Sequence, residues 1–182
     1  MTQDRYEERY GPTQRNVAVL LISAVFVAAL VWLPDTPLLV QIPGLALFGG
    51  GGVLMLLIMF SRKTALRVDS SGITLGGFPL RYRATTAVVP WHDIVAVVLW
   101  RQHMAFGARM DYVGVQRKNG LPPLPGPGTG RLSQRAASVL VPHVPGDIAV
   151  ASRPVNGWSL DAAAFESSMN RLAPHVPVVD AR

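Results

Sequence analysis

The stretch that decides the fold is Val17–Leu33, which reads VAVLLISAVFVAALVWL and holds a single polar side chain, Ser23. A helix over this stretch would be roughly 26 Å long, at about 1.5 Å per residue. That length is close to the hydrocarbon thickness of a bilayer, about 30 Å. Length and composition together predict a transmembrane helix over residues 17–33.

A second apolar run follows at Leu38–Phe60, with Gln41 as its one polar side chain. Proline is tolerated in the first turn of a helix, where its missing N–H is not needed. Pro43 therefore predicts a second span from about residue 43 to residue 60, with Leu38–Ile42 in the membrane interface. Between the runs, Pro34–Pro37 breaks the helix because proline cannot continue the hydrogen-bond ladder.

The flanks of this hairpin indicate its orientation, because Lys and Arg lie on both outer flanks and are missing from the connecting turn. These basic residues are Arg5, Arg9 and Arg15 before the first span, and Arg62, Lys63 and Arg67 after the second. The positive-inside rule then places both termini in the cytoplasm. We expect a cytoplasmic tail over residues 1–15, a two-helix transmembrane hairpin over 16–60, and a cytoplasmic domain over 61–182.

Two other interpretations of the apolar runs are weaker. A cleaved signal peptide would not have a second span within a few residues, and the N-terminal region here is long and mixed in charge. Buried core helices would be unusual, because two successive runs of this length with so little charge are rare in soluble domains.

Small residues mark both spans and predict close helix packing. They are Ala24 and Ala28 in the first span and Gly49, Gly50, Gly51 and Gly52 in the second. Packing within the hairpin and contact with another chain are both compatible with this pattern. Because neither span contains an ionisable side chain, a proton relay or ion pathway has no group to use. The hairpin is therefore expected to be an anchor.

From Ser61 onward, short alternating segments separated by turn residues indicate strands. The expected strands are Ala65–Val68, Ile73–Leu75, Leu80–Val89, Ile94–Trp100, Tyr112–Gln116, Ser138–Val141 and Ile148–Ala151. Leu121–Gly130 is rich in Pro and Gly and predicts a loop. An amphipathic helix over about 160–172 follows, with Ser159 as its N-cap and Pro174 beyond its end. The fold class is thus a membrane α-hairpin followed by a soluble α+β domain.

Two motifs carry a family resemblance: Leu66–Leu75, which reads LRVDSSGITL, and Val89–Ile94, which reads VPWHDI. They resemble the bacterial pleckstrin-homology-like (PH-like) domains of small actinobacterial membrane proteins, which follow a pair of membrane helices. The resemblance covers roughly residues 65–120 and the last helix. It implies a strongly bent antiparallel sheet or barrel capped by the terminal helix, with Trp91 in the core. It also implies that the loop over Arg101–Arg109 and the Pro/Gly-rich segment contact partners.

The sequence offers little for catalysis. There is no cysteine, which excludes disulfides, thiolate metal sites and thiol nucleophiles. The four histidines have no metal-ligand spacing, and His92 and Asp93 would point to opposite faces of a strand. The run GPGTGR, starting at Gly126, lacks the Lys-Ser/Thr ending of a phosphate loop. We therefore predict no enzymatic activity, no cofactor and no metal.

Charge is the most informative feature of the soluble domain, which has 14 Lys and Arg against 7 Asp and Glu after residue 60. The candidate contacts with an anionic surface are Arg62, Lys63, Arg67, Arg81, Arg83, Arg101 and Arg109. Arg81 and Arg83 would share one face of a strand. A solvated basic surface and docking on the anionic inner leaflet, worth about 1 kcal/mol per basic residue, both fit this excess. Nucleic-acid binding is disfavoured because no recognition helix is apparent.

These observations predict a membrane-anchored PH-like protein that acts as a non-enzymatic interaction module at the bacterial cytoplasmic membrane. Its partner would be a protein, a second copy of the chain or the anionic inner leaflet. The alternative is an accessory or assembly subunit of a larger membrane complex, with the hairpin as its interface. The bacterial origin is inferred from the use of Arg in place of Lys and from abundant Ala, Val, Gly and Pro.

Overall fold

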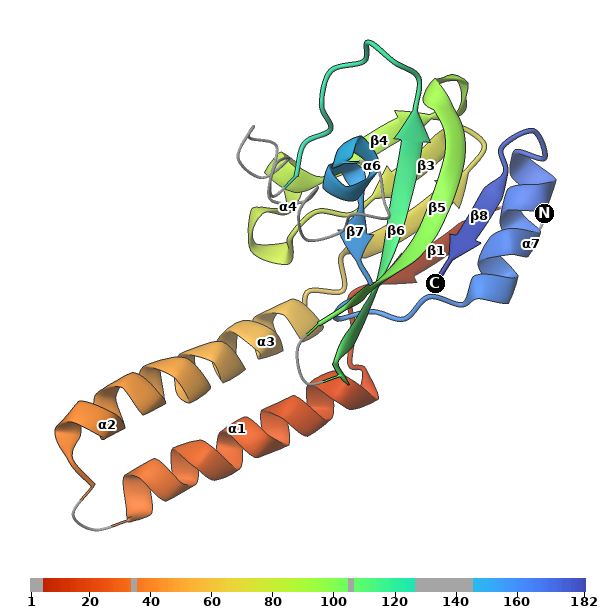
Figure 1. Cartoon of the computed structure of the whole chain (residues 1–182). Helices are drawn as coiled ribbons and strands as arrows, with labels where there is room; N and C mark the ends of the chain where they lie inside the picture. Colours follow the sequence, from red (N-terminus) through yellow and green to blue (C-terminus); the bar gives the residue numbers. More distant parts are fainter. Residues whose placement is uncertain (1–4, 34–35, 105–106, 127–145) are drawn as a thin grey trace. The chain divides into compact units, whose positions relative to one another are not determined.

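A computed structural model describes residues 5–33, 36–104, 107–126 and 146–182 of the chain. The chain divides into two compact units (Figure 1). The hairpin unit is Tyr10–Arg62, and the sheet unit combines Met1–Arg9 with Lys63–Arg182. The N-terminal segment thus belongs to the same unit as the long C-terminal part of the chain.

The hairpin unit contains two long apolar helices among the described residues. The first is α1, Gln14–Trp32, whose N-cap Thr13 accepts a hydrogen bond from the backbone N–H of Asn16. The second is continuous over α2 (Leu38–Gly44), the π-helical segment η1 (Leu45–Gly50) and α3 (Gly51–Met59). Both are long and apolar enough to cross a membrane.

The second helix begins earlier than the sequence predicts. It starts at Leu38, so Leu38–Ile42 is helical and Pro43 lies inside α2. The carbonyl of Pro37 accepts from the backbone N–H groups of Val40 and Gln41, which closes the first turn without any side-chain cap. The π-helical segment starts just after Pro43, where a proline disturbs the regular helical ladder.

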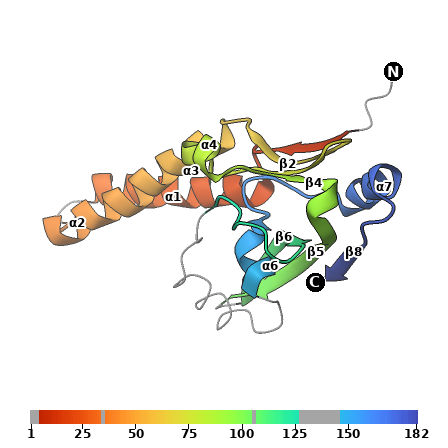
Figure 2. The ribbon, with the colours of Figure 1, turned by 90° about the horizontal axis from the view of Figure 1, so that it is seen from above.

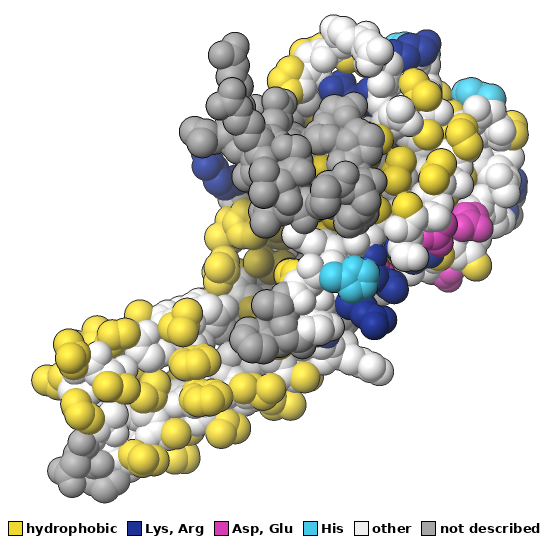
Figure 3. Space-filling view, viewed as in Figure 1, with side chains coloured by type: hydrophobic (Ala, Val, Ile, Leu, Met, Phe, Trp, Pro, Cys, Tyr) yellow, Lys and Arg dark blue, Asp and Glu magenta, His cyan; other side chains and the backbone are white. Residues whose placement is uncertain are grey.

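Contacts between the two helices satisfy the polar group of the second span. The Gln41 side chain donates to the carbonyl oxygen of Leu30 at 2.9 Å. Phe26 and Phe48 stack with their ring centroids 4.6 Å apart. Outward-facing side chains are apolar and exposed, as for Leu39 at 87%, and Figure 3 shows hydrophobic side chains over the visible face of this unit. An apolar surface of this extent indicates association with a membrane.

Sheet A is antiparallel, in the order β1-β2-β3-β4. Its strands are β1 (Tyr6–Arg9), β2 (Thr64–Asp69), β3 (Gly72–Leu75) and β4 (Ala87–Pro90). The prediction of a tail over residues 1–15 is wrong for β1, which pairs with β2 from Tyr6 opposite Val68 to Arg9 opposite Thr64. The predicted turn between β2 and β3 is confirmed, with Asp69 opposite Gly72.

Sheet B has the order β7-β6-β5-β8. Its strands are β5 (Ile94–His103), β6 (Arg109–Arg117), β7 (Arg153–Pro154) and β8 (Val178–Ala181). The strands predicted for Ile94–Trp100 and Tyr112–Gln116 are confirmed and extend further. Strand β8 was not predicted, and it pairs in parallel with β5. Figure 2 shows the two sheets as separate layers.

The alternation of side chains along each strand builds the core. In sheet A the buried side chains of one face are Leu66, Val68, Ile73, Leu75, Ala87 and Val89. In sheet B the corresponding set is Val97, Leu99, Val113 and Val115. Helix α7, Ala162–Leu172, adds buried Phe165 and Met169 at helical spacing and packs against β1 and β2. Its N-cap is Asp161, whose carboxylate accepts from the N–H of Ala164, and not Ser159 as predicted.

The other face of sheet B is covered by α6, Gly146–Ala151 (Figure 2). The strand predicted for Ile148–Ala151 is therefore wrong. Helix α6 approaches closely because β6 has Gly114 there, where a Cβ would collide with the Ser152 hydroxyl. Ser152 accepts from the indole N–H of Trp100 at 2.9 Å, so Trp100 is buried with its polar group satisfied. The strand predicted for Ser138–Val141 lies outside the described residues.

The hairpin unit is an insertion in the connection between β1 and β2. Arg9 and Thr64 are partners in the β1–β2 ladder, and opposite residues in such a ladder lie about 5 Å apart. The chain thus leaves the sheet at Arg9 and returns beside it after both apolar helices. Strand β1 is an edge strand of sheet A, and a short turn could span the distance between its end and the start of β2.

This topology makes a direct prediction. Replacing residues 10–62 with a four-residue turn containing Asn-Gly should give a water-soluble protein with a cooperative thermal transition, because such turns join antiparallel strands. The same protein without residues 1–9 should lose β1 and the buried Tyr6, and melt at a lower temperature. Circular dichroism during heating measures both. Equal melting temperatures would show that β1 does not stabilise the sheet unit.

Candidate functional site

The connector between β3 and β4, Gly76–Thr86, holds two of the predicted basic contacts in helical turns. Pro79–Arg81 forms the 3-10 turn η2, and Tyr82–Thr85 forms α4. The strand predicted from Leu80 is therefore wrong before Ala87. So is the prediction that Arg81 and Arg83 share one face of a strand. Both side chains are nevertheless exposed.

Threonine hydroxyls hold the connector in this conformation. Thr85 donates to the carbonyl of Arg81 and accepts from the N–H of Phe78, both at 2.8 Å. Thr86 donates to the carbonyl of Tyr82 at 2.7 Å and accepts from the N–H of Gly77 at 3.1 Å. Such side-chain bonds compete with sheet pairing. They explain why an alternating, β-branched segment folds here as helical turns.

Lys63 and Tyr82 join the connector to the start of β2. The Lys63 ammonium group donates to the carbonyl of Pro79 at 2.6 Å and lies 5.4 Å from the centroid of the Tyr82 ring. The Tyr82 hydroxyl donates to the carbonyl of Thr64 at 2.9 Å. A cation over an aromatic ring at an exposed site is worth about 0.5–1 kcal/mol. These contacts fix the place of Lys63 beside Arg81 and Arg83.

Together these residues line a surface groove of about 560 Å³. Its lining is Lys63, Leu80, Arg81, Tyr82, Arg83 and Ala84. The Lys and Arg side chains carry positive charge and N–H donors, so the groove offers positive charge and hydrogen-bond donors. It can bind an anionic group. Of the predicted basic contacts, the structure brings Lys63, Arg81 and Arg83 together here.

Two other predicted contacts, Arg67 and Arg101, have acidic partners within the sheets. Arg67 on β2 lies 3.3 Å from the Asp69 carboxylate. Arg101 on β5 makes a bidentate pair with Asp111 on β6, at 2.5 and 3.1 Å. Hydrogen bonds from Arg101 lower the pKa of Asp111. The Arg101–Asp111 pair joins β5 to β6, whereas the Arg67–Asp69 pair lies within β2. In both cases less of the arginine charge is available to an external anion.

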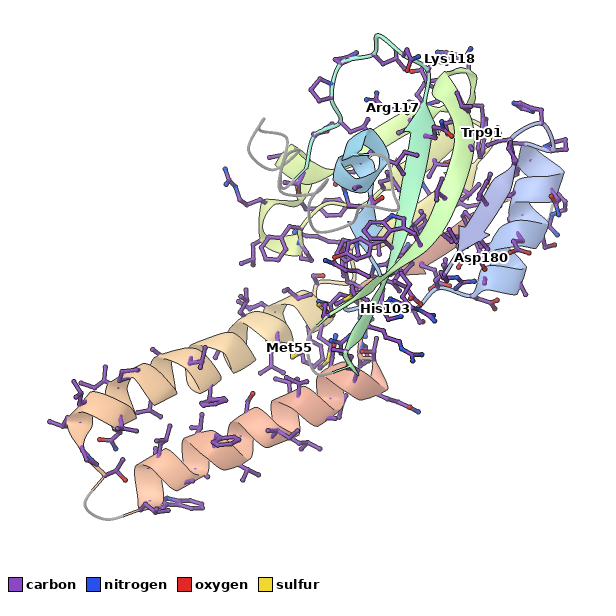
Figure 4. All side chains as sticks on the ribbon, viewed as in Figure 1. Met55, Trp91, His103, Arg117, Lys118 and Asp180 are labelled. Atoms are coloured by element: carbon purple, nitrogen blue, oxygen red, sulfur yellow. The ribbon has the colours of Figure 1, made fainter. Side chains whose placement is uncertain are left out.

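Arg62 and Arg109 are exposed, and neither lines the groove. Arg62 has φ of 49°, a left-handed conformation, where the chain leaves α3 for β2. Arg109 begins β6 opposite His103. Figure 4 shows His103 at one end of the β5–β6 hairpin and Arg117, Lys118 and Trp91 toward the other. The structure thus scatters these predicted contacts.

The motif around Trp91 has a structural role, because it joins two strand connections. Trp91 lies in the 3-10 turn η3 (Trp91–Asp93) and is half-buried, while Ile94 is buried. The Trp91 indole donates to the carbonyl of Asp69 at 3.0 Å and so ties the β2–β3 turn to the start of β5. His92 and Asp93 do not point to opposite faces as predicted. Their side chains lie 3.3 Å apart because the turn curls them together.

Shifted pKa values mark structural contacts. Burial and the carboxylate of Glu8 raise the pKa of Tyr6, whose hydroxyl lies 3.0 Å from that carboxylate. Tyr6 also accepts from the N–H of Asp161 at 3.2 Å, which links β1 to α7. Burial raises the pKa of Tyr112, which stacks on Trp100 with centroids 4.1 Å apart. Among the described residues, no group of His, Asp and Glu is arranged to hold a metal ion.

Of the predicted helix-packing residues, only some face the neighbouring helix. Ala24, Gly49 and Gly52 line an apolar groove of about 470 Å³ in the hairpin unit. A Cβ at Gly52 would lie 3.9 Å from Leu20. A Cβ at Gly50 or Gly51 would meet no atom within 4 Å in the part of the chain that the structure describes. Ala28 is half-buried. Gly44, which sequence reasoning missed, faces Leu30 most closely, with a Cβ 2.6 Å from its side chain.

Comparison with protein-family models, with curated proteins and with solved structures found no match to this chain.

Sequence reasoning also missed the buried Arg153 and the exposed apolar side chains of the connector. Arg153 is 5% exposed and donates to the carbonyls of Thr85 and Pro125, so it ties α4 to the segment after β6. Phe78 and Leu80 are 40% and 55% exposed. Residues 78–83 read FPLRYR, which combines apolar and basic side chains of the kind found in this groove. The alternation in the same residues predicts a strand, which drew attention away from the groove.

A titration prediction follows from the C-terminal strand. Arg182 hydrogen bonds lower the pKa of Asp180 on β8 to about 2. The unfolded value is about 3.9. Since the folded pKa is the lower one, this stabilisation is present above pH 4 and is lost as the pH falls toward 2. The melting temperature of the full chain in detergent should fall over this range by more than that of Asp180→Asn. If the melting temperatures of the two proteins fall in parallel over this range, the Asp180–Arg182 pair does not contribute to the stability of the fold.

Proposed function

We propose that this chain is a membrane-anchored, non-enzymatic interaction module, held at the membrane surface by its apolar hairpin. The observation that supports this most is the pairing of β1 with β2 on either side of the hairpin. Strands that pair in one sheet lie on the same side of a bilayer. Two apolar helices between them, each long enough to cross, then form an anchor that crosses twice and returns the chain to its sheet.

The proposed side is the cytoplasm of a bacterium, with both termini inside. Arg15 lies in the first turn of α1, and Arg62 and Lys63 follow α3, while residues 33–61 contain no Lys or Arg. Positive charge next to membrane spans favours the cytoplasmic side. Arg5 and Arg9 also flank the hairpin, but both form ion pairs with Glu7. The orientation therefore rests mainly on the residues closest to the helices.

We propose a PH-like fold for the sheet unit. Its support is the order of elements: four antiparallel strands in one layer, then β5, β6 and β7 in the second layer, then α7. Two features are additional: the hairpin in the β1–β2 connection, and β8, which lies parallel to β5 beyond α7. Interaction in such a domain would use its loops, in agreement with the basic groove in the β3–β4 connector.

The topology can be tested because the chain contains no cysteine. Thr36→Cys, in the hairpin turn, should react with a membrane-impermeant maleimide in intact cells. Ser70→Cys, in the exposed β2–β3 turn, should react only after the membrane is permeabilised. The opposite labelling pattern would show that the orientation is the reverse of the one proposed. Labelling of both sites in intact cells would contradict a hairpin that crosses the membrane twice. A cysteine at Gly107, an exposed position beyond β5, is a second cytoplasmic reporter.

A second candidate function is an accessory subunit of a larger membrane complex. It is favoured by the open backbone at Gly50 and Gly51, where small residues would let another helix approach closely. Because these positions do not face α1, Leu there should leave the hairpin itself intact. This makes them informative about contacts between chains.

We expect Gly50→Leu with Gly51→Leu to leave the size of the detergent-solubilised particle unchanged, as the interaction-module function requires. Native electrophoresis of freshly solubilised membranes measures this. Gly52→Leu is the matched control, since its side chain would meet Leu20 and Ser23 and should lower the melting temperature. A smaller particle for the double variant alone would favour the subunit function.

A further inference from the structure

We infer that the β3–β4 connector is a membrane-docking wedge, in which Phe78 and Leu80 enter the interface while Lys63, Arg81 and Arg83 bind anionic phospholipid headgroups. This inference rests on the proposed anchoring of the hairpin and names the partner of the groove described above. The wedge is defined as Lys63 together with Phe78–Arg83.

The first support is the composition of the exposed wedge. Phe78 and Leu80 are 40% and 55% exposed, and Lys63, Arg81 and Arg83 are exposed around them. No Asp or Glu occurs between Ser70 and Thr86. Apolar side chains beside long basic ones are typical of surfaces that lie in the headgroup region, where arginine and lysine extend toward phosphates. Tyr82 adds a ring of the kind that is enriched at this level.

The second support is the rigidity of the wedge. Thr85 and Thr86 bond both to its carbonyls and to its N–H groups. A Cβ at Gly77 would collide with Thr85, so the chain is tightly packed at the base of the wedge. The structure therefore holds Phe78 and Leu80 outward in a fixed conformation. Such preorganisation lowers the conformational entropy lost on binding.

The third support is the covalent distance to the anchor. Three residues, Phe60 to Arg62, separate the end of α3 from Lys63. An extended chain covers at most about 3.6 Å per residue, so Lys63 lies within about 15 Å of chain from the helix end. If α3 ends at the membrane surface, the groove that contains Lys63 is confined to the layer next to the headgroups. A bilayer is therefore always within reach of this surface, which favours lipid over a diffusing protein partner.

The experiment uses the full-length chain with one fluorophore at Ala84→Cys, an exposed position in the groove lining. The protein is reconstituted into vesicles of neutral phosphatidylcholine, or of phosphatidylcholine with phosphatidylglycerol, that contain headgroup-region nitroxide quenchers. We expect at least twofold stronger quenching in the anionic vesicles, and a loss of that difference between 50 and 500 mM salt. A probe at Ser70→Cys, in the β2–β3 turn, should show little quenching in either.

Variants then separate the contributions of charge and apolar contact. Arg81→Glu with Arg83→Glu should abolish the difference between anionic and neutral vesicles. Phe78→Ser with Leu80→Ser should reduce quenching in both. Lys118→Glu with Arg171→Glu carries the same change in charge at exposed positions outside the wedge and should change neither. If a wedge variant fails to fold, the salt dependence of quenching in the chain that carries only the Ala84→Cys probe still tests whether the wedge binds anionic headgroups.

Flotation of the same vesicles distinguishes the two proposals. Protein that does not float with neutral vesicles would overturn the anchoring on which the wedge rests. Protein that floats but shows equal, salt-independent quenching in neutral and anionic vesicles would overturn the wedge alone. The anchored module would then stand with a protein partner at the groove.

Discussion

The pairing of β1 with β2 is the constraint on which the rest of this structure depends. It closes a loop of more than fifty residues, and closing such a loop costs entropy that only a stable sheet recovers. Within the ladder, Tyr6 lies opposite Val68, and Glu7 accepts from the Thr64 hydroxyl. Tyr6 reaches further, since its ring packs edge-on against Phe165 of α7, with centroids 5.7 Å apart. The strand before the hairpin is thus bound to both the sheet and the terminal helix.

The same constraint bears on the anchoring that we propose for the hairpin. A helix joined to a domain by one flexible linker lets the domain tumble, whereas a hairpin whose two ends enter neighbouring strands restricts it at two points. The chain that returns from the hairpin enters β2 at Thr64. The residue just before it, Lys63, lines the basic groove. The first residue of the groove and the return of the chain to the sheet are therefore found in one short segment of chain.

Local patterns allowed part of this fold to be predicted, and long-range pairing accounts for most of what was missed. The apolar runs, the LRVDSSGITL hairpin and β5 and β6 each carry their own periodicity. Strand β1 reads YEER, which resembles a solvated tail until its partner is known. Strand β8 lies beside β5 but about eighty residues away in sequence. In the connector, alternation was present but threonine hydroxyls satisfied the backbone locally, so the pattern that indicates a strand produced helical turns.

Net charge alone is a poor guide to the site, because it counts every arginine equally. Arg67, Arg101 and Arg182 have carboxylate partners within 3.3 Å, and Arg153 is buried against backbone carbonyls. A cation that already neutralises a carboxylate contributes little to the field felt by an external anion. Lys63, Arg81 and Arg83 differ because the folded connector gathers them around one groove. The attraction for an anionic surface that we propose would therefore depend on where the fold concentrates unneutralised charge, which a count along the sequence does not give.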